Sequence, residues 1–355
     1  MTQPASPSHF NIAVLPGDGI GVDVTRETVR VLQALEPKLD GVKFAFTEQA
    51  VGAGEFLRSG NPLPEEAFAA CRAADAVLLG AMGIPSVRWP DGKEMTPQID
   101  LRERLDLYAG PRPIKLYHPN DTPLKDYHAG EINFVIVREN TEGLFSARLS
   151  SNPSDDEARD VLRLTRKGCE RVIRFAFDLA RKRRKHCTLV DKANVLPSMV
   201  FMRRIFDEIA EQYPDVTTDR VYVDAMALFL VRKPEAFDVM VTENMFGDIL
   251  SDLAGGLVGG MGMAPSGDIG DDCAIFQPSH GTAPDIAGKD IANPTATILS
   301  AAMMLDWLGH EQTQDGAKMI EAAVLRVFDD PSNRTPDMGG KLKTSELTDL
   351  IIAAL

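Results

Sequence analysis

The sequence predicts an α/β protein in which strands of a largely parallel sheet alternate with helices. Two patterns carry this prediction: short apolar runs recur along the chain, and amphipathic helical patterns lie between them. A third observation concerns size. At 355 residues the chain is long for one hydrophobic core, so two closely packed domains are expected.

The strands are expected where short apolar runs, many of them containing valine or isoleucine, stand between turn-like segments. A helical pattern follows the first run and continues to Leu35, and a second spans Lys167–Arg184 with apolar residues on one face. The expected strands are residues 11–15, 76–79, 134–137, 187–190, 220–223 and 239–242.

Two passages are interpreted as crossovers between domains. Residues 109–113 contain a glycine and two prolines, and residues 255–262 contain five glycines. Clustered glycines allow close backbone approach and hinge-like changes in φ and ψ. The expected domains are therefore 108–258 and the two chain ends together, 1–107 with 259–355.

The composition excludes several classes of protein. A formal net charge of −14 disfavours nucleic acid as a general partner, because phosphate binding needs a basic surface. The basic run Arg181–Lys185 fits the last turn of a helix better than a polyanion site. Membrane spans and a signal peptide are not predicted, and four scattered cysteines without a CxxC pair suit a reducing, cytoplasmic compartment.

The first glycine-rich segment, Gly17–Gly21, follows the first expected strand. A dinucleotide-binding Rossmann turn would need a different final glycine spacing and an acidic residue about 20 residues further on. The segment lacks both, so a tight strand-to-helix turn is the favoured interpretation.

Paired carboxylates give a stronger chemical signal. Asp248 and Asp252 stand four residues apart, so on a helix they project from one face and repel each other. A hard cation such as Mg²⁺ or Mn²⁺ would relieve that repulsion, and Asp224, after another expected strand, is a candidate third ligand. The alternative is a solvated helix face.

Cationic residues stand at several expected element ends. Three arginines in one crevice would suit a di- or tricarboxylate, since guanidinium groups bind carboxylates bidentately. Lys192, just after a strand, is a candidate base, although a single lysine is more often structural. The arginines are Arg102, Arg112 and Arg138.

The segment His280–Pro294 is predicted to be a long, structured loop whose small residues let a ligand approach the backbone. Asp285 suits a ribose 2′-hydroxyl and would repel a 2′-phosphate, which favours NAD over NADP. A surface loop without a ligand is the alternative.

Together these segments resemble the β-decarboxylating dehydrogenase family, which includes isocitrate, homoisocitrate, 3-isopropylmalate, and D-malate or tartrate dehydrogenases. The resemblance extends from about Ile12 to the C-terminus. It rests on Pro16–Gly21, Arg138–Gly143, Lys192–Asn194, Asn244–Asp252 and His280–Pro294, which in combination are highly specific.

The resemblance implies an isopropylmalate dehydrogenase-like two-domain subunit with its active site in the interdomain cleft, not a conventional Rossmann fold. Residues 1–107 with 259–355 would form a large NAD-binding domain, and 108–258 a domain for substrate, metal and dimerisation. The residues implied in NAD binding are Ile20, His280, Gly281, Asp285, Ile286 and Asn293.

The same resemblance implies the chemistry, an NAD- and metal-dependent oxidation and decarboxylation of a malate-type 2-hydroxy acid. The three arginines would bind the malate carboxylates, and Asp224, Asp248 and Asp252 would hold Mg²⁺ or Mn²⁺. Lys192, with Asp224, would remove the hydroxyl proton. Such enzymes are usually homodimers, in which the equivalents of Lys192 and Asp224 reach into the neighbouring subunit's site.

Two features depart from the family pattern. Phe145 stands where the family has a tyrosine that protonates the enolate, and phenylalanine has no proton to give. The familiar Ala-Asn-x-Arg-Pro is altered at residues 109–113. We therefore expect weakened or altered decarboxylation, and a regulatory subunit that has lost its chemistry is an alternative function.

The substrate's 3-substituent is expected to meet the loop 91–99. Thr96 and Gln98 would supply donors for an extra carboxylate, whereas Met95 and Ile99 would supply an apolar wall. The loop thus leaves isocitrate-type and isopropylmalate-type substrates open, with D-malate or tartrate as an alternative.

Overall fold

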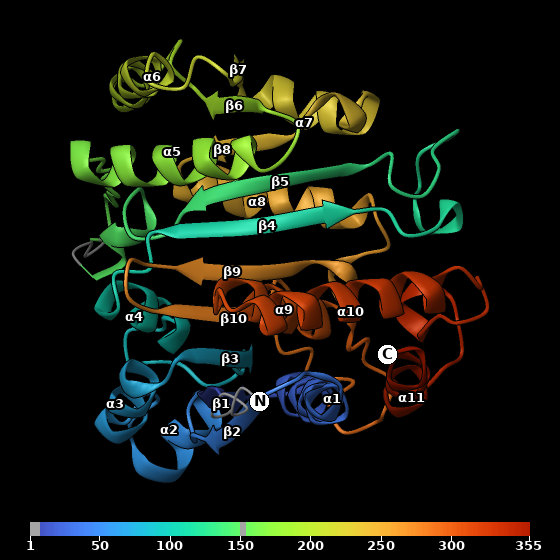
Figure 1. The fold of residues 1–355 in the computed structure, drawn as a ribbon. Coiled ribbons are helices and arrows are strands. Elements are labelled where there is room, and N and C mark those ends of the chain that lie inside the picture. Colours follow the sequence, from blue (N-terminus) through green and yellow to red (C-terminus); the bar gives the residue numbers. More distant parts are fainter. Residues whose placement is uncertain (1–7, 150–153) are drawn as a thin grey trace, which may run out of the picture. The chain divides into compact units, whose positions relative to one another are not determined.

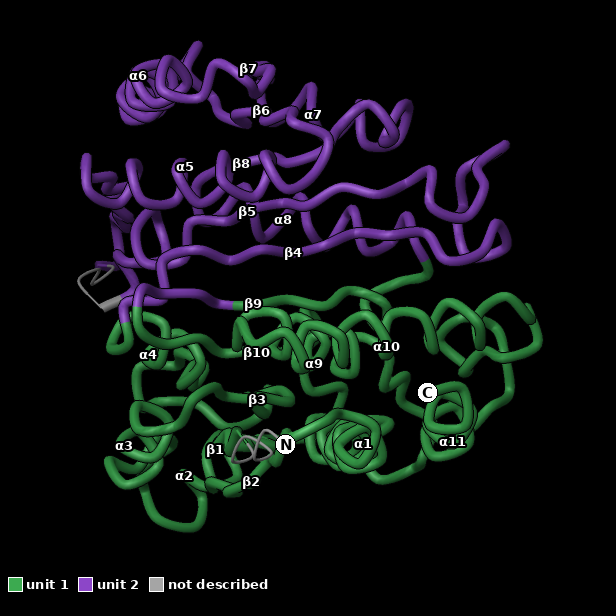
Figure 2. Tube along the Cα trace, in the orientation of Figure 1, with its two compact units in different colours: residues 1–105, 259–267, 272–355 green, residues 106–258, 268–271 purple. Residues whose placement is uncertain are grey.

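A computed structural model describes residues 8–149 and 154–355. Helices and strands alternate along the chain (Figure 1), which confirms the predicted α/β class. The chain divides into two compact units (Figure 2). Unit 1 is Met1–Leu105, Gly259–Gly267 and Asp272–Leu355, and unit 2 is Asp106–Val258 and Asp268–Asp271.

The strands of unit 1 pair in parallel in the order β2-β1-β3-β10. The two inner strands β1 and β3 are nearly continuous apolar runs because helices cover both faces of such a sheet. Strand β9 begins in unit 1 and ends in unit 2. The bounds are β1 (Ser8–Gly17), β2 (Val42–Glu48), β3 (Ala76–Ala81), β9 (Pro265–Ile269) and β10 (Ala274–Pro278).

The helices of unit 1 include one, α9, that is buried on nearly every side, in keeping with its almost wholly apolar sequence. The α-helices are α1 (Ile20–Leu35), α2 (Ala53–Ser59), α3 (Glu65–Ala73), α4 (Pro97–Arg104), α9 (Thr295–Trp307), α10 (Glu311–Phe328) and α11 (Thr344–Ala354). Short 3₁₀ turns are η1 (Glu36–Lys38), η5 (Met261–Met263) and η6 (Pro336–Met338).

The strands of unit 2 lie in the order β4-β5-β8-β6-β7. Strands β4 and β5 are antiparallel, and β5, β8, β6 and β7 pair in parallel. The bounds are β4 (Ala109–Lys115), β5 (Asn133–Glu139), β6 (His186–Asp191), β7 (Thr217–Tyr222) and β8 (Val239–Thr242).

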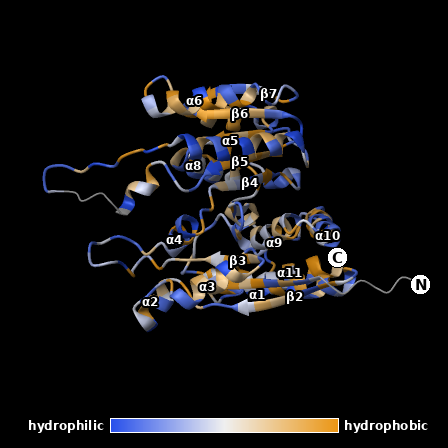
Figure 3. Ribbon diagram, turned by 60° about the vertical axis from the view of Figure 1, so that its left-hand side comes forward, coloured by the Kyte–Doolittle hydropathy of each residue, from blue (hydrophilic) through white to orange (hydrophobic). Residues whose placement is uncertain are grey.

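The helices of unit 2 cover its sheet on both faces and bury two apolar clusters, one under α5 and α6 and the other under α7 and α8. Figure 3 shows hydrophobic residues concentrated on the strands and hydrophilic ones on the outer helix faces. The helices are α5 (Arg166–Arg181), α6 (Pro197–Ala210), α7 (Val223–Arg232) and α8 (Asn244–Gly256), with 3₁₀ turns η2 (Pro119–Asp121), η3 (Phe145–Leu149) and η4 (Pro234–Ala236).

One predicted crossover is placed a few residues too late. Residues 109–113 are part of strand β4, and the chain enters unit 2 earlier, at Asp106. The two prolines are tolerated because they stand two residues apart, so both missing N–H groups belong to the same edge of the strand. In the second passage α8 continues to Gly256, and the unit boundary lies at Val258/Gly259.

The unit boundaries also place residues 268–271 with unit 2. There Asp268 accepts a hydrogen bond from Asn140 Nδ2 at 2.8 Å, and Asp271 accepts one from the Tyr108 hydroxyl at 3.1 Å. Within each unit, the assignment of NAD binding or substrate binding remains a prediction.

The basic run after α5 is structural, as the sequence favoured. Helix α5 ends at Arg181 rather than at the predicted Arg184. Arg183 Nε donates to the buried carboxylate of Asp238 at 2.7 Å, and Arg181 pairs with Asp215 at 2.8 Å. All four cysteines are free and buried. None of the described helices is both long and apolar enough to span a membrane.

Candidate active site

Two arginines of unit 2 share one face of its sheet. Arg112 on β4 stands opposite Ile136 on β5, and Arg138 lies two residues further along β5. Residues paired in this way point to the same face, so the two guanidinium groups are diagonal neighbours. Both are buried, with Arg112 5% and Arg138 2% exposed.

Helix α8 places its carboxylates against these arginines. Arg138 Nη1 donates to Asp248 Oδ1. The Nη1 atom of Arg112 lies 3.5 Å from the same oxygen and 3.9 Å from Asp252 Oδ1. The structure therefore brings together four residues predicted from the sequence, Arg112, Arg138, Asp248 and Asp252.

Two further polar residues complete this cluster, and the sequence reasoning missed their role. Asn244 Oδ1 accepts from Arg138 Nε at 3.0 Å and Nη2 at 2.7 Å, and Ser251 Oγ accepts from Arg112 Nη1 at 2.5 Å. Their helical spacing relative to Asp248 was the available signal, since residues three and four apart on α8 share a face.

The N-terminal cap of α8, Glu243, helps to fix the position of this helix. The buried side chain of Glu243 accepts from the backbone N–H groups of Met245 and Phe246, at 3.1 and 2.7 Å. These bonds satisfy N–H groups that the first helical turn leaves without partners. Burial nevertheless raises the pKa of Glu243 above its ordinary value.

The paired carboxylates have the character of a cation site. Partial desolvation raises the pKa of Asp252, the neighbouring charge of Asp248 adds to this, and Arg112 opposes it. Oxygen donors whose charged forms repel each other suit a hard divalent ion. Asp248 and Asp252 thus fit two of the three metal ligands that the sequence predicts.

The third expected ligand lies elsewhere in the same chain. Asp224, in the first turn of α7, accepts from Lys192 Nζ at 2.7 Å, and this bond lowers the pKa of Asp224. Across residues 8–149 and 154–355, no three His, Cys, Asp or Glu side chains are placed to hold a metal ion. The described part of one chain therefore does not assemble the predicted triad, because Asp224 follows β7, two strands away from β8 and the start of α8.

Lys192 and Asp224 meet because they follow the adjacent parallel strands β6 and β7, whose carboxyl ends lie together. The backbone beside Lys192 is held by Asp191, which is fully buried and accepts from the N–H of Ala193 at 3.0 Å. Arg203 on α6 donates to both carboxylate oxygens of Asp191, each at 2.7 Å. The lysine therefore extends from a backbone that a bidentate ion pair fixes.

Phe145 lies at the start of η3, close to the arginine cluster. Its ring centroid is 5.1 Å from the guanidinium carbon of Arg138, within the range of a cation–π contact. The departure from the family pattern thus stands next to a predicted substrate-binding residue.

The remaining predicted substrate residues belong to unit 1. Thr96 precedes α4, and Gln98 and Arg102 stand four residues apart on that helix, on one face. Arg102 is buried, and the buried Oε1 atom of Gln98 has no hydrogen-bond partner among the described residues. Met95, predicted as an apolar wall, is buried as well.

Unit 1 also contains a cavity of about 340 Å³. It collects four of the six residues predicted to bind NAD and two others of the predicted loop, Ile291 and Ala292. Three more, Gly262, Pro336 and Asp337, were not predicted. Gly281 and Asp285 are exposed on the same loop and do not line it. The lining is Ile20, Gly262, His280, Ile286, Ile291, Ala292, Asn293, Pro336 and Asp337.

The polar groups of this cavity suit a ring that carries hydrogen-bond donors. Burial lowers the pKa of His280, so its imidazole is neutral near pH 7. Its Nδ1 lies 2.9 Å from the carbonyl of Gly281, which can only accept, so the buried and unpartnered Nε2 is an acceptor. An apolar pocket with a few fixed polar groups fits the adenosine part of a dinucleotide.

Close packing maintains the cavity wall. A Cβ atom at Gly262 would lie 2.7 Å from both Asn293 Cβ and Asp337 Oδ2, so a larger residue there would displace two lining side chains. Asn293 Nδ2 donates to Asp337 Oδ2 at 3.2 Å. Asp337, 44 residues after Asn293, gave no signal in the sequence because only the fold brings the two together.

A family model described as isocitrate/isopropylmalate dehydrogenase matches residues 11–351. A 3-isopropylmalate dehydrogenase from Corynebacterium efficiens is 45% identical over 98% of this chain and 99% of its own length. One from Moorella thermoacetica is 46% identical over 93% of each chain.

Solved structures agree with this relationship. An isocitrate dehydrogenase from Methylococcus capsulatus superposes with a TM-score of 0.88 at 40% identity, over 97% of this chain and 99% of that one. A β-decarboxylating dehydrogenase from Thermococcus kodakarensis has a TM-score of 0.80 at 40% identity, over 97% and 96%. The predicted fold is confirmed, and the chain is a dehydrogenase that belongs to the isocitrate/isopropylmalate dehydrogenase family.

Proposed function

We propose that this enzyme oxidises and decarboxylates a 3-substituted malate, with NAD⁺ and Mg²⁺ or Mn²⁺ as cofactors. The observation that carries the proposal is the cluster in unit 2, where buried Arg112 and Arg138 converge on Asp248, one helical turn from Asp252. Buried guanidinium groups beside paired carboxylates match a substrate that brings both carboxylates and a metal-binding hydroxyl.

The arginines would bind the malate carboxylates. In this structure they engage Asp248, Ser251 and Asn244. A substrate carboxylate would replace those residues as the hydrogen-bond acceptor of the two arginines. A bound cation would then neutralise the charge of Asp248. Arg102, in unit 1, is a further candidate for the same role.

The cofactors would supply the steps that side chains cannot perform: NAD⁺ accepts a hydride, and the divalent ion polarises oxygen. Asp248 and Asp252 would hold the ion. The cavity of unit 1 would take the adenosine part of NAD⁺ between His280 and Asn293. The exposed carboxylate of Asp285 on the same loop would repel a 2′-phosphate, which favours NAD over NADP.

Proton transfer would fall to Lys192, paired with Asp224 at 2.7 Å. Because these two residues do not join Asp248 and Asp252 within the described part of one chain, we propose a homodimer in which each subunit lends Lys192 and Asp224 to its neighbour's site. The exposed apolar side chains of Leu228 and Ile249, on α7 and α8, suit a surface that another subunit covers.

The first substrate to test is 3-isopropylmalate, because relatives of that name match nearly the whole chain at 45% and 46% identity. A relative from Methanocaldococcus jannaschii, 42% identical, is named a 3-isopropylmalate/3-methylmalate dehydrogenase. The buried Oε1 atom of Gln98 has no hydrogen-bond partner among the described residues and could accept from a polar 3-substituent. Substrates with such a substituent, isocitrate and tartrate, are therefore tested as well.

The test is NADH formation by the purified protein with Mn²⁺ and NAD⁺. The panel contains 3-isopropylmalate, 3-methylmalate, isocitrate, homoisocitrate, D-malate and tartrate, each with and without EDTA. Metal-dependent reduction with one of them supports the proposal and identifies the 3-substituent. Reduction that EDTA leaves unchanged would contradict the metal's role.

A second function is favoured by one observation, the phenylalanine at position 145. It takes the place of the family's proton donor, and its ring contacts Arg138. A subunit that binds substrate and NAD⁺ but turns over slowly would act as a regulatory partner. Binding of both ligands, measured by calorimetry, without NADH formation from any substrate of the panel would select this function.

A further inference from the structure

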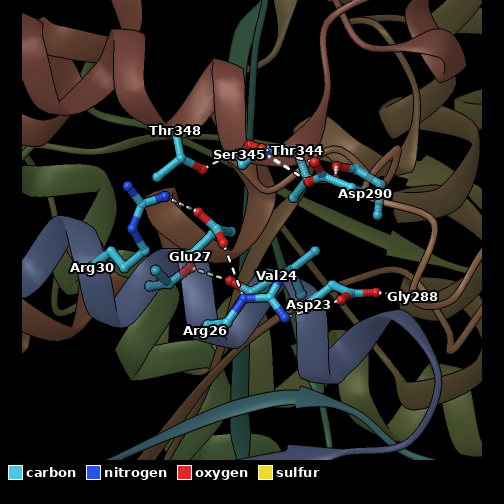
Figure 4. Close-up of polar contacts among 12 residues, drawn as sticks. Asp23, Val24, Arg26, Glu27, Arg30, Gly288, Asp290, Thr344, Ser345 and Thr348 are labelled. Atoms are coloured by element: carbon cyan, nitrogen blue, oxygen red, sulfur yellow. Dashed lines mark hydrogen bonds and ion pairs between the residues drawn. The ribbon is translucent and has the colours of Figure 1, made fainter.

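The loop that lines much of the unit 1 cavity is held by two helices that flank it. This cofactor loop, residues 280–293, contributes His280, Ile286, Ile291, Ala292 and Asn293 to the lining. Helix α1 holds the loop at Thr282 and Gly288, and the start of the C-terminal helix α11 holds it at Asp290 and Ala292. Figure 4 shows the contacts of Gly288 and Asp290. The shape of the loop therefore depends partly on residues that do not line the cavity, namely Asp23, Thr344 and Ser345.

Helix α1 holds the loop through one backbone and one side-chain contact. The N–H of Ile20 donates to the carbonyl of Thr282 at 2.8 Å. Asp23, which is buried, accepts from the N–H of Gly288 at 2.7 Å. Gly288 has a φ of 70°, a conformation that favours glycine, and in this conformation its N–H reaches the Asp23 carboxylate.

Helix α11 holds the second half through four hydrogen bonds made by two adjacent residues. Thr344 donates its N–H to the carbonyl of Asp290 at 3.0 Å and its Oγ1 to the carbonyl of Ala292 at 2.6 Å. Ser345 donates its N–H and Oγ to the Asp290 carboxylate, at 3.0 and 2.8 Å. Asp290 thereby binds the first N–H groups of α11, which the helix itself leaves without partners.

The contacts work in both directions. The loop satisfies the helix start, and the helix start fixes Asp290 at a φ of 57°, a conformation that a residue with a side chain adopts at a cost. Ala292 lines the cavity directly, whereas no residue of α11 does. The hydrogen bonds by which the first turn of α11 reaches the lining therefore run through the loop.

We propose that Thr344 and Ser345 are positioning residues for the dinucleotide, and that cofactor binding and the N-terminal turn of α11 stabilise each other. This inference rests on the proposed function, because it assumes that the cavity takes NAD⁺. The coupling is reciprocal: whatever orders the loop also tightens the helix start, and loosening the helix start weakens cofactor binding.

Helix α11 offers a matched pair of substitutions. Thr344 and Thr348 are one turn apart, both fully buried, and each hydroxyl donates to a backbone carbonyl. Only the carbonyl that Thr344 reaches belongs to the cofactor loop; Thr348 bonds to Thr344 O in its own helix, at 2.8 Å. Valine removes either hydroxyl with little change in shape.

The experiment measures the Kd of NAD⁺ by calorimetry for the full-length wild type and for Thr344→Val, Thr348→Val and Thr344→Ser. Leaving the Ala292 carbonyl without its donor should raise the Kd for Thr344→Val roughly fivefold or more. Thr348→Val should stay within roughly twofold, and Thr344→Ser, which restores the hydroxyl, should bind like the wild type. Hydrogen exchange should show that NAD⁺ slows the amides of residues 344–346 in the wild type.

The outcomes separate the two claims. A wild type that binds NAD⁺, with Thr344→Val unchanged or Thr348→Val equally weakened, overturns the positioning role and leaves the proposed function standing. Unchanged exchange at residues 344–346 overturns the coupling. A wild type that does not bind NAD⁺ at all overturns the proposed function together with this inference.

Discussion

Phe145 is the residue whose chemistry bears most directly on the last step of the proposed reaction. Its ring lies 5.1 Å from the Arg138 guanidinium, where it adds a cation–π contact but no proton. After CO₂ has left, the carbanion-like product must be protonated, and a positioned acid accelerates such a step about 100-fold or more. We expect Phe145→Tyr to raise turnover at least about tenfold if protonation limits the wild type.

The measurement is the steady-state rate of NADH formation together with the rate of CO₂ release. Phe145→Leu is the control, since it removes the ring and adds no proton; it should not exceed the wild type. Equal turnover for Phe145→Tyr and the wild type would mean that protonation uses another donor or is not limiting.

Glu139, next to Arg138, gives a pH dependence of stability. Burial raises its pKa from 4.5 to about 7, although the N–H groups of Thr141 and Glu142 stabilise the anion. Between these two pH values the folded protein holds a proton that the unfolded chain has released. Stability should therefore fall as the pH rises from about 4.5 to about 7, by an amount on the order of a few kcal/mol, and level off above.

Urea unfolding of the wild type and Glu139→Gln across pH 4.5 to 8 would measure this effect. The glutamine variant cannot ionise, so the difference between the two free energies of unfolding should change through that window and be constant above it. Parallel curves for the two proteins would contradict a buried, titrating Glu139.

Between elements, the ion pair that links β6 to α6 supports the position of Lys192. Asp191 is fully buried, and Arg203 is its bidentate partner. Removing one member of a buried pair leaves an uncompensated charge, so Arg203→Ala should lower the free energy of unfolding by about 3 kcal/mol. Arg204→Ala is the control, because its ion pair with Glu208 is long and exposed, and it should cost less than about 0.5 kcal/mol.

Denaturant unfolding of both variants makes the comparison. Equal stability losses for the two arginines would show that Arg203 is not the special partner of Asp191. A selective loss for Arg203 would support a fixed backbone under Lys192.

Strands formed by continuous apolar runs were predicted from the sequence, whereas strands that contain polar residues, prolines or glycines were missed. All six predicted strands exist; five of them are buried, apolar runs, whereas β7 is an edge strand that is only partly buried. The prediction missed β2, which is mostly exposed and contains polar residues between its apolar ones. It also missed β4, whose two prolines resemble a turn. Strands β9 and β10 were hidden among glycines and acidic residues in the segment 265–278.

The candidate site was predicted unevenly for a similar reason. Motif residues such as Arg138, Asp248 and His280 carry recognisable spacing, and the fold brings most of them into two groups, one in each unit. Asp337 and Thr344 reach their partners only through long-range packing. No local pattern marks such residues, since their role is set by the tertiary structure.

Taken as a whole, one chain carries Lys192 with Asp224 in one group and Asp248 with Asp252 in another. If two subunits complete each other's sites, two inactive variants should restore activity when their subunits mix. In a symmetric dimer of Lys192→Ala with Asp252→Ala, one site receives both substitutions and the other receives neither.

Equimolar unfolding and refolding of the two variants should therefore yield about a quarter of the wild-type activity, because about half of the dimers are mixed and each has one intact site. The measurement is NADH formation before and after mixing, with each variant refolded alone as the control. Restoration requires that the two groups act across a subunit boundary. A mixture as inactive as its parents, although co-purification through an affinity tag on one variant shows that mixed dimers have formed, would place the complete site within one chain instead.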